Sequence, residues 1–557
     1  MPKPHDDADD ADKGLAAYAG RWIARLWNRV VGQGGTPQQA QQAAISARHK
    51  ETPQVSFVPT SSPLTFSPIL DDVSQALPKK TVIYLVGGAV RDAFLKKESH
   101  DLDFALPRNA LKVARKAANA LQGAYYRMDD EHQTGRVVLV ADDGTRTTMD
   151  FAAMGSPDLE EDLRKRDFTI NAMAVDVHQP QELLDPLGGL TDLLNKRLRV
   201  CSPTAFLDDP VRVLRAIRMA AGFSLTMVSE TRQLIKQAVD SLPMVSPERV
   251  RDELFKIFDG PQPATSIRAL EMVGALEHVL PEIIATKGVS QSPPHIYDVW
   301  EHTLHTLQRL DVVLSLLDEG YSHDNESGGD ITSGLISLRL GRYRKQVTQH
   351  FNTSLSIERS SRALLFLAAL YHDAGKPECR IVEEDGRIRF TGHEEGGAKM
   401  AADRGTAFHL SNAEIDRIKV IVRNHMRPWH LAKEEKPPSR RAIYRFFRDT
   451  QEAGVDICLL DLADIMAIYD PTSLQEELPK HLEIVRTLLE AYWEQKEEII
   501  YPPALVDGND LMRKLKLRPG PKIGELLEAI REAQAMGEVK TKGDALEFGE
   551  RWLEGKD

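Results

Sequence analysis

The chain has 557 residues, of which 28 % are charged and 42 % are hydrophobic, and its formal net charge is −12. This length exceeds what one hydrophobic core supports and predicts several domains, while no apolar run reaches the roughly 18 residues that indicate a membrane span. Its three cysteines, Cys201, Cys379 and Cys458, form no CxxC pair, and the first thirteen residues are acidic. A disulfide framework and a targeting signal are therefore not expected, and a cytoplasmic location is.

The order of apolar patterns predicts an α+β chain in five parts. Residues 1–75 are expected to be a largely disordered leader with one amphipathic helix in LAAYAGRWIARLWNRVV. Short β-rich runs alternate with a helical pattern over 76–204, which predicts a small mixed α/β domain. The rest is predicted to be helical, with a disordered insertion at about 317–341. These helical parts are a neck at 205–290, a domain at 291–480 and a tail at 481–557.

The stretch YLVGGAVRDAFLKKESHDLDFAL (84–106) has the features of a nucleotide site. A strand ending in Gly87-Gly88 lets backbone approach a ligand closely, and the helix that follows suits a phosphate, with Arg91 able to add a charged contact. In the next strand Asp101 and Asp103 are two residues apart and point to one face. Oxygen ligands in this arrangement suit Mg²⁺, and two such ions can clamp an in-line phosphoryl transfer.

This string resembles the catalytic signature of the class II nucleotidyltransferases, the family of tRNA CCA-adding enzymes and bacterial poly(A) polymerases. The resemblance implies nucleotide contacts at Gly87, Gly88, Arg91 and Asp92, and a third carboxylate on a neighbouring strand, for which Asp150 in TMDF is the candidate. A purely structural Asp at a strand end remains open for Asp150, because its face relative to Asp103 does not follow from sequence.

Two further blocks resemble motifs of the same family. In EEDLRKRDFTINAMAVD (160–176) the resemblance implies that Arg166, Asp167 and Asn171 contact the triphosphate and ribose, for which a guanidinium fork and oxygen acceptors are suited. In DDPVRVLRAIRMAAGF (208–223) it implies that Asp209 and Arg212 read the incoming base, with Arg215 on the same basic helix. Asp209 also precedes a proline, as helix caps often do, so a structural role stays open.

Five segments beyond residue 290 resemble the HD domain of metal-dependent phosphohydrolases. Imidazole and carboxylate ligands of this kind suit Mn, Fe, Ni or Zn. The candidate ligands are His302, His372, Asp373 and Asp464, with His393 and His425 completing a second metal position. Asp464 is preferred to Asp461 because it matches the family's Ala-Asp pair, and Lys376 is a candidate phosphate contact. Basic residues in SRRAIYRFFR (439–448) suit RNA, although its aromatic residues suit a core equally well.

Together these motifs predict a template-independent nucleotidyltransferase that adds C, A or both to the 3′ end of tRNA from CTP and ATP, with Mg²⁺ in the head and a transition metal in the HD domain. A poly(A) polymerase, an A-adding specialist and an HD phosphohydrolase with a silent head are the alternatives. No membrane partner is expected. Only AAMGSPD (152–158) separates Asp150-Phe151 from the next motif, too short to cross a cleft. This resembles the subfamilies that divide the labour and favours CC addition, with the A-adding enzyme next.

Overall fold

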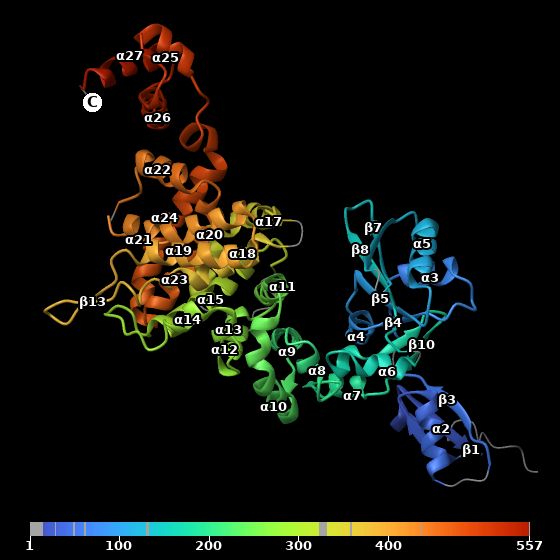
Figure 1. Ribbon diagram of the computed structural model, residues 1–557. Coiled ribbons are helices and arrows are strands. Elements are labelled where there is room, and N and C mark those ends of the chain that lie inside the picture. Colours follow the sequence, from blue (N-terminus) through green and yellow to red (C-terminus); the bar gives the residue numbers. More distant parts are fainter. Residues whose placement is uncertain are drawn as a thin grey trace, which may run out of the picture. The chain divides into compact units, whose positions relative to one another are not determined.

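A computed structural model describes residues 15–27, 29–47, 51–60, 63–129, 133–156, 158–321, 331–356, 359–434 and 436–555 (Figure 1). It forms two compact units, Met1–Ser241 and Leu242–Asp557. The first holds the strands of the mixed domain and the second is helical, so the predicted α+β class is confirmed. Among the described residues, no helix is long and apolar enough to cross a membrane.

The first unit opens with a small module of its own. Its elements are η1 (Ala16–Tyr18), β1 (Arg21–Leu26), β2 (Arg29–Gly34), α2 (Pro37–Ser46) and β3 (Gln54–Val58). The strands form an antiparallel sheet in the order β2-β1-β3, and Ala24 packs against Ala40 and Ala44 of α2. The expected helix within 15–31 is therefore wrong. The burial pattern of RWIARL fits the period of a helix as well as that of a strand. Its partner strand β3 lies about thirty residues away, so no local pattern predicts the pairing.

This module is fixed to the head rather than hanging from it as a leader. Trp22 Nε1 donates to the Leu183 carbonyl at 2.8 Å, and Asp185 N donates to the Gly35 carbonyl at 2.8 Å. A Cβ at Gly35 would lie 1.6 Å from the Asp185 oxygen, so only glycine permits this approach. Residues 1–14 of the expected leader lie outside the described residues.

A seven-stranded sheet in the order β10-β9-β4-β5-β8-β7-β6 forms the head. The strands are β4 (Tyr84–Val86), β5 (Asp101–Leu106), β6 (Ala124–Asp129), β7 (Thr134–Val140), β8 (Arg146–Ala153), β9 (Ala174–Asp176) and β10 (Gln179–Leu184). Within the described part of this sheet, β5 and β8 are the one pair of strands that run parallel. The face that carries Phe104 and Phe151, whose rings stack at 4.6 Å, is covered by α5. The opposite face carries the acidic residues of β5.

Short helices and strands connect and extend this sheet within the first unit. They are α3 (Ile69–Ala76), α4 (Gly88–Phe94), α5 (Ala110–Leu121), α6 (Leu159–Arg164), η2 (Thr169–Asn171), α7 (Gly189–Leu194), β11 (Arg197–Leu198), α8 (Ala205–Asp208), α9 (Arg212–Gly222), β12 (Thr226–Met227) and α10 (Ser229–Ala238). The turn η3 (Val239–Met244) leads into the second unit.

The second unit is built around α23 (Ala453–Ile468), in which every residue except Asp464 is buried. A helix that is apolar on all sides belongs at the centre of a bundle. The helices before it are α11 (Pro247–Asp259), α12 (Pro263–Met272), α13 (Leu276–Val279), α14 (Pro281–Ile284), α15 (Val299–Leu316), α16 (Ile331–Leu340), α17 (Arg344–Asn352), α18 (Ser361–Tyr371), α19 (His393–Ala407), α20 (Asn412–Asn424), α21 (Arg427–Ala432) and α22 (Arg440–Thr450). The turn η5 (Gly341–Tyr343) and the two-stranded hairpin β13 (Ile381–Val382) and β14 (Ile388–Arg389) connect some of them.

Helix α24 (Pro471–Glu494) packs against α23, and η6 (Lys496–Ile500) follows it. The remaining helices, α25 (Gly508–Leu515), α26 (Pro521–Ala535) and α27 (Lys542–Leu553), pack a separate core. Leu511, Leu526 and Ile530 are central to this cluster. Helix α26 begins just after Gly520.

The disordered insertion expected at 317–341 includes a stretch that forms a helix. Residues 331–340 form α16, in which Ile336 and Leu340 are fully buried, so this part of the expectation is wrong. Disorder was expected because this stretch is rich in Gly and Ser. That composition outweighed a short apolar repeat, which packs against α24, a helix distant in sequence. Residues 322–330 of the expected insertion lie outside the described residues.

Candidate functional site

Three carboxylates meet on the open face of the head sheet. Asp101 and Asp103 stand on alternate positions of β5, and the parallel register places Asp103 directly beside Asp150 of β8. Residues paired in this way point to the same face. Arg136 of β7 holds Asp150 through two hydrogen bonds, Nε to Oδ1 and Nη2 to Oδ2, each 2.8 Å long. Asp150 is therefore both a neighbour of Asp103 and half of an ion pair, and Arg136 is a residue that the motifs did not indicate.

Gly87 gives the backbone close access to this group. Its φ of +79° lies in the region that favours glycine, and a Cβ there would be 3.1 Å from Arg166 Nη1 and 3.4 Å from Asp103 Oδ2. The Arg166 Nε is buried and has no hydrogen-bond partner among the described residues. The Arg166 guanidinium and the Asp103 carboxylate thus both lie close to Gly87 at the end of β4.

The environment of Asp103 disfavours its ionised form. Surrounding protein raises the pKa of Asp103, and the charges of Asp150 and Asp101 raise it further, whereas Arg166 acts in the opposite direction. The side chain nevertheless remains open to solvent on one side. Three clustered carboxylates with too little positive charge around them form a site that a cation would stabilise.

The second and first motifs meet in one polar network. Arg91 Nη1 donates to Asn171 Oδ1 at 2.6 Å, and Asn171 Nδ2 donates to Asp167 Oδ1 at 3.1 Å. Arg215 Nη2 lies 2.8 Å from Asp167 Oδ2. Burial alone would raise the pKa of Asp167, but Arg215 and the hydrogen bonds lower it overall. Arg91 also pairs with Asp92, so in this structure its guanidinium is engaged within the protein.

Asp209 and Arg212, the pair assigned to base selection, lie close to each other. Asp209 Oδ2 and Arg212 Nε are 3.9 Å apart. Arg212 also donates to the carbonyls of Lys165 and Ala205, at 3.0 and 3.2 Å, which ties it to the segment that carries Arg166. Helix α9 begins at Arg212 with Val211 as its N-cap, so Asp209 does not cap it.

Four histidines and two aspartates converge in the second unit, and they come from five separate segments. His302 lies on α15, His372 and Asp373 follow α18, His393 opens α19, His425 follows α20, and Asp464 lies on α23. Two sets of ligand atoms each lie within 4.8 Å of one another. These are His302, His372 and Asp373, and Asp373, His393 and His425. Asp373 belongs to both sets.

The orientation of the rings fits metal ligation. His372, His393 and His425 each bring Nδ1 within 2.7–2.8 Å of a carbonyl three residues earlier, so Nδ1 donates there and Nε2 is the ring nitrogen turned into the cluster. These Nε2 atoms turn toward Asp373, at 3.3, 3.4 and 3.9 Å from its oxygens. His393 Nε2 and His425 Nε2 are buried without a hydrogen bond among the described residues.

The choice between two aspartates on α23 can be read from their neighbours. Asp464 Oδ1 lies 2.9 Å from His302 Nε2 and 3.6 Å from His372 Nε2. Asp461 instead accepts from His481 Nδ1 at 2.8 Å, away from the cluster. Asp464 is therefore the one that faces the histidines.

Charge is divided unevenly within the cluster. Burial opposes protonation of His372, but Asp373 and Asp464 outweigh it and raise its pKa to about 10. Burial lowers the pKa of His425 to about 3, and His372 and His393 act in the same direction. The carboxylates thus demand positive charge while at least one imidazole stays neutral, which is the donor set that a divalent metal satisfies.

Lys376 and two residues that the motifs did not indicate border the cluster. Lys376 Nζ lies 2.5 Å from Asp373 and donates to Gln291 Oε1 at 2.7 Å. The ring of His295 stands edge-on to that of His302, with centroids 5.3 Å apart. Burial lowers the pKa of His295 to about 4, and Lys376 and His302 add to this effect. A lone His in a Pro-rich segment offered no spacing from which to predict this position.

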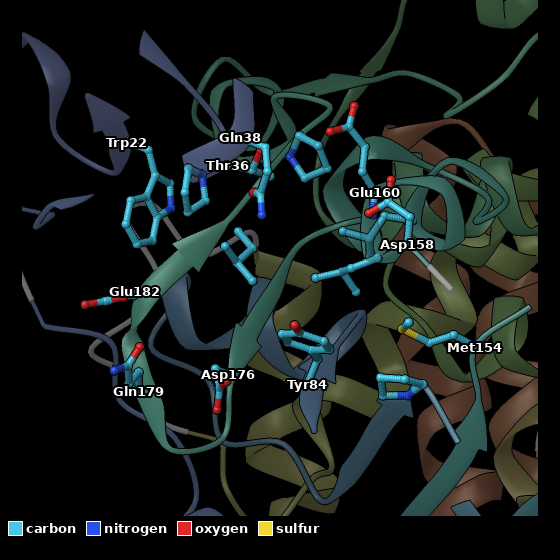
Figure 2. A pocket seen from close by; sticks show the side chains of 16 residues that line it. Trp22, Thr36, Gln38, Tyr84, Met154, Asp158, Glu160, Asp176, Gln179 and Glu182 are labelled. Atoms are coloured by element: carbon cyan, nitrogen blue, oxygen red, sulfur yellow. The ribbon is translucent and has the colours of Figure 1, made fainter. Parts of the chain in front are cut away.

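A cavity of about 360 Å³ lies between the N-terminal module and the head of the first unit (Figure 2). Figure 2 shows Trp22 and Gln38 of the N-terminal module on one side and Tyr84 and Asp176 of the head on the other. The buried side chains of Val86, Ala105 and Leu163 belong to the apolar cluster that Tyr84 borders. None of the predicted site residues lines this cavity, so it is not the place of the chemistry inferred from the motifs.

The basic helix at 439–448 does not offer free cations. Arg441 and Arg445 both pair with Glu532, and Arg440 pairs with Glu498. Tyr444, Phe446 and Phe447 are buried. The alternative of core aromatic residues is therefore the one that the structure supports.

Several known families match parts of the chain. The family described as Poly A polymerase head domain matches residues 83–199, and the HD domain family matches 334–467. The family tRNA nucleotidyltransferase domain 2 matches 417–548. His302 precedes the matched HD range, although it lies within hydrogen-bonding distance of Asp464.

Individual relatives extend over most of the chain. An A-adding tRNA nucleotidyltransferase of Deinococcus radiodurans is 33 % identical over 84 % of this chain and 95 % of its own length. A CC-adding tRNA nucleotidyltransferase of Thermus thermophilus is 31 % identical over 85 % of this chain and 94 % of its own. A solved CCA-adding enzyme, in an apo form, is 21 % identical with a TM-score of 0.53, covering 87 % of this chain and 92 % of that one, which shows a shared fold.

Proposed function

Since the chain belongs to the tRNA nucleotidyltransferase family, we propose that it adds C, A or both to the 3′ end of tRNA, with CTP and ATP as donors. The observation that carries this proposal is the in-register placement of Asp103 beside Asp150, with Gly87 and Arg166 next to them. The 3′-hydroxyl of the tRNA attacks the α-phosphorus of the nucleotide, and pyrophosphate leaves. We propose a cytoplasmic location with this activity, since three cysteines without a CxxC pair suit a reducing compartment.

The head residues divide this work by their chemistry. Asp101, Asp103 and Asp150 would hold Mg²⁺, which supplies charge stabilisation at the transferred phosphoryl group when bound. Arg166 has a free, buried Nε and is suited to the triphosphate. Asp167 and Asn171 are suited to accept from the ribose hydroxyls. Arg91 and Asp92 are proposed to contact the nucleotide from α4, and Arg91 also orients Asn171, while Arg215 favours the ionised form of Asp167.

Base selection is assigned to Asp209 and Arg212. The carboxylate accepts and the guanidinium donates hydrogen bonds, which together suit the Watson–Crick edges of C and A. The hydrogen bonds from Arg212 to Lys165 and Ala205 fix the guanidinium before a nucleotide arrives. A preordered pair of this kind selects a base without a nucleic-acid template.

We assign CC addition in preference to the terminal A. The connection from β8 to α6 spans residues 154–158 and is held down by hydrogen bonds. Gly155 N donates to Asp162 at 3.0 Å, Lys165 donates to the Gly155 carbonyl at 3.3 Å, and Ser156 donates to Glu161. A segment this short, fixed at its middle, is poorly suited to reshape the base pocket for a second nucleotide.

Extension of a tRNA transcript that lacks CCA tests this assignment directly. The purified chain receives CTP alone, ATP alone and both, and the products are separated at single-nucleotide resolution. Addition of two C residues, with no A in the mixture, is expected. Completion through A would contradict the CC assignment, addition of A only to a transcript ending in CC would indicate the A-adding specialist, and long A tails would indicate a poly(A) polymerase.

The second unit is proposed to be a metal-dependent phosphohydrolase of the HD type. The observation that carries this is the convergence of His and Asp ligand atoms within 4.8 Å, with His393 Nε2 and His425 Nε2 buried and without a hydrogen bond among the described residues. His302, His372, Asp373 and Asp464 would hold one transition metal ion, and His393 and His425 would hold a second with Asp373. Such ions lower the pKa of a bound water and make it a nucleophile.

The double variant His372→Ala with Asp373→Ala separates the two activities. Bound Mn²⁺ and hydrolysis of p-nitrophenyl phosphate or its diester should disappear, while tRNA extension persists. The matched variant Asp101→Ala with Asp103→Ala should show the reverse. Hydrolysis that survives the first variant would contradict the HD assignment, and a wild-type chain that only hydrolyses would indicate a silent head.

A further inference from the structure

The segment 288–298, here called the 288–298 loop, is closed on itself just before α15. Gly288 N donates to Asp298 Oδ2 at 2.9 Å, and Val299 N donates to the Val289 carbonyl at 3.0 Å. Gln291 Nε2 donates to the Tyr297 carbonyl across the loop at 3.3 Å. Because both ends are joined and the middle is bridged, the loop has a defined shape at the N-terminus of the helix that carries His302.

Contacts with other elements set the loop against the His/Asp cluster. Gln291 accepts from Lys376, which itself contacts Asp373. Ser292 Oγ accepts from Ile388 N at 2.7 Å. On the far side, the Tyr297 ring stacks on His305 at 4.3 Å and 13°. The loop is thereby tied to the HD segment after α18, to β14 and to α15.

His295 is the one residue of this loop that brings an imidazole to the cluster. Its ring stands edge-on to His302, at 5.3 Å between centroids and 77° between planes. The side chain is half-buried, and within the described residues its ring nitrogens form no hydrogen bond. His372, His393 and His425 differ, because each is fixed by a carbonyl that receives its Nδ1 proton.

This contrast separates ligands from a contact residue. His295 belongs to neither set of converging ligand atoms. It shares the border of the cluster with the Lys376 ammonium, which Gln291 holds in place. A fixed ammonium and a half-open imidazole on one side of a metal group are suited to the oxygens of a phosphate ester.

We propose that His295 contacts the phosphate ester that the HD centre hydrolyses and, with Lys376, positions its phosphoryl oxygens against the metal ligands. This inference rests on the proposed phosphohydrolase activity. It adds a specificity-determining residue that comes from outside the ligand set and from outside the matched HD range. The substrate class is a phosphate monoester or diester, because these present anionic oxygens to the two groups.

The test uses the full chain loaded with Mn²⁺, with three variants. His295→Ala removes the imidazole, and His295→Gln restores one donor and one acceptor. His305→Ala is the matched control, since it removes the stacking partner of Tyr297 and loosens the same loop without touching His295. Bound Mn²⁺ is measured by mass spectrometry, inorganic phosphate binding by calorimetry, and hydrolysis of both p-nitrophenyl esters by steady-state kinetics.

For His295→Ala we expect unchanged Mn²⁺ content, with the phosphate Kd and the ester KM raised about tenfold and kcat changed less, as is typical for loss of one contact to a charged group. His295→Gln should recover part of the affinity, and His305→Ala should stay within about twofold of the wild type. Unchanged phosphate binding in His295→Ala, an equal loss in His305→Ala, or loss of Mn²⁺ in His295→Ala would each overturn the proposal.

The same measurements separate this failure from failure of the proposed hydrolase. A wild-type chain that binds Mn²⁺ but cleaves neither ester would refute the phosphohydrolase, and the phosphate Kd of the variants would still decide the His295 contact. A wild-type chain that binds no Mn²⁺ would refute both.

Discussion

Asp373 is the point at which a single substitution should empty the whole HD centre. It belongs to both sets of ligand atoms, with Oδ2 toward His302 and His372 and Oδ1 toward His393 and His425. Asp373→Asn is therefore expected to lower bound Mn²⁺ from two ions per chain to none. His425→Ala reaches only one set and should lower it from two to one.

The effect on stability follows from the same geometry. With free Mn²⁺ at one hundred times its Kd, each occupied site stabilises the fold by about 2.7 kcal/mol. The gain on adding Mn²⁺ should thus be about 5.4 kcal/mol for the wild type, about half of that for His425→Ala, and none for Asp373→Asn. Without metal, Asp373→Asn should also cost about 3–5 kcal/mol, because it leaves the nearly buried Lys376 without its carboxylate.

Metal content by mass spectrometry and urea unfolding with and without Mn²⁺ measure both quantities. Asp461→Asn is the matched control, since Asp461 is buried on the same helix as Asp464 but pairs with His481. It should lose stability and keep both ions. Retention of both ions by Asp373→Asn, or loss of both by His425→Ala, would refute the shared-ligand geometry.

Three further outcomes are expected. Asp103→Ala should lower tRNA extension by at least about 10³ while tRNA binding persists in a filter assay, and near-normal extension would rule out its role. Replacing Asp209 and Arg212 together by Ala should weaken selection among the four nucleotides by roughly 1–3 kcal/mol for the lost pairing, measured as ratios of kcat/KM, and an unchanged preference would contradict the assignment. Asp456→Asn should destabilise the second unit by about 3–5 kcal/mol at pH 7, since Asp456 is buried against Arg417. Burial opposes ionisation of Asp456, but Arg417 and a neighbouring imidazole lower its pKa overall. The stability that the ionised Asp456 contributes is therefore present above about pH 4, the ordinary pKa, and is lost as the pH falls through the lowered pKa. In urea unfolding, the difference in free energy of unfolding between the wild type and the variant should narrow only below about pH 4.

The head could be predicted from sequence because its signals are local. Alternate positions of one strand share a face whatever the partner strands are, so Asp101 and Asp103 needed no tertiary information. The side on which Asp150 lies depended on the β5–β8 register, which pairs residues nearly fifty positions apart. Arg136 was not predicted for the same reason, because its contact with Asp150 depends on how β7 and β8 pair in the sheet.

The errors lie where local pattern and distant partner disagree. The run Arg21–Leu26 has residues that suit helix or strand, and its pairing with β3 decided for strand. Residues 331–340 have a helical apolar repeat embedded in a Gly- and Ser-rich stretch, and burial of Ile336 and Leu340 decided for helix. In both places the energy that selects the conformation comes from packing that no short window contains.

The HD centre shows the opposite case, in which distant residues were predicted although nothing local joins them. Histidines and aspartates are rarely buried, and placing them in helices as apolar as α18 and α23 costs desolvation that only a strong partner offsets. The ligands were nevertheless predicted, because their segments resemble the HD family, and Asp464 was preferred to Asp461 only through its match to the family's Ala-Asp pair. His295 lies in a Pro-rich loop outside the segments that resemble the HD family, so no motif pointed to it. Its place beside His302 depends on loop closure through Gln291 and Asp298, and contact residues of this kind become visible only in the fold.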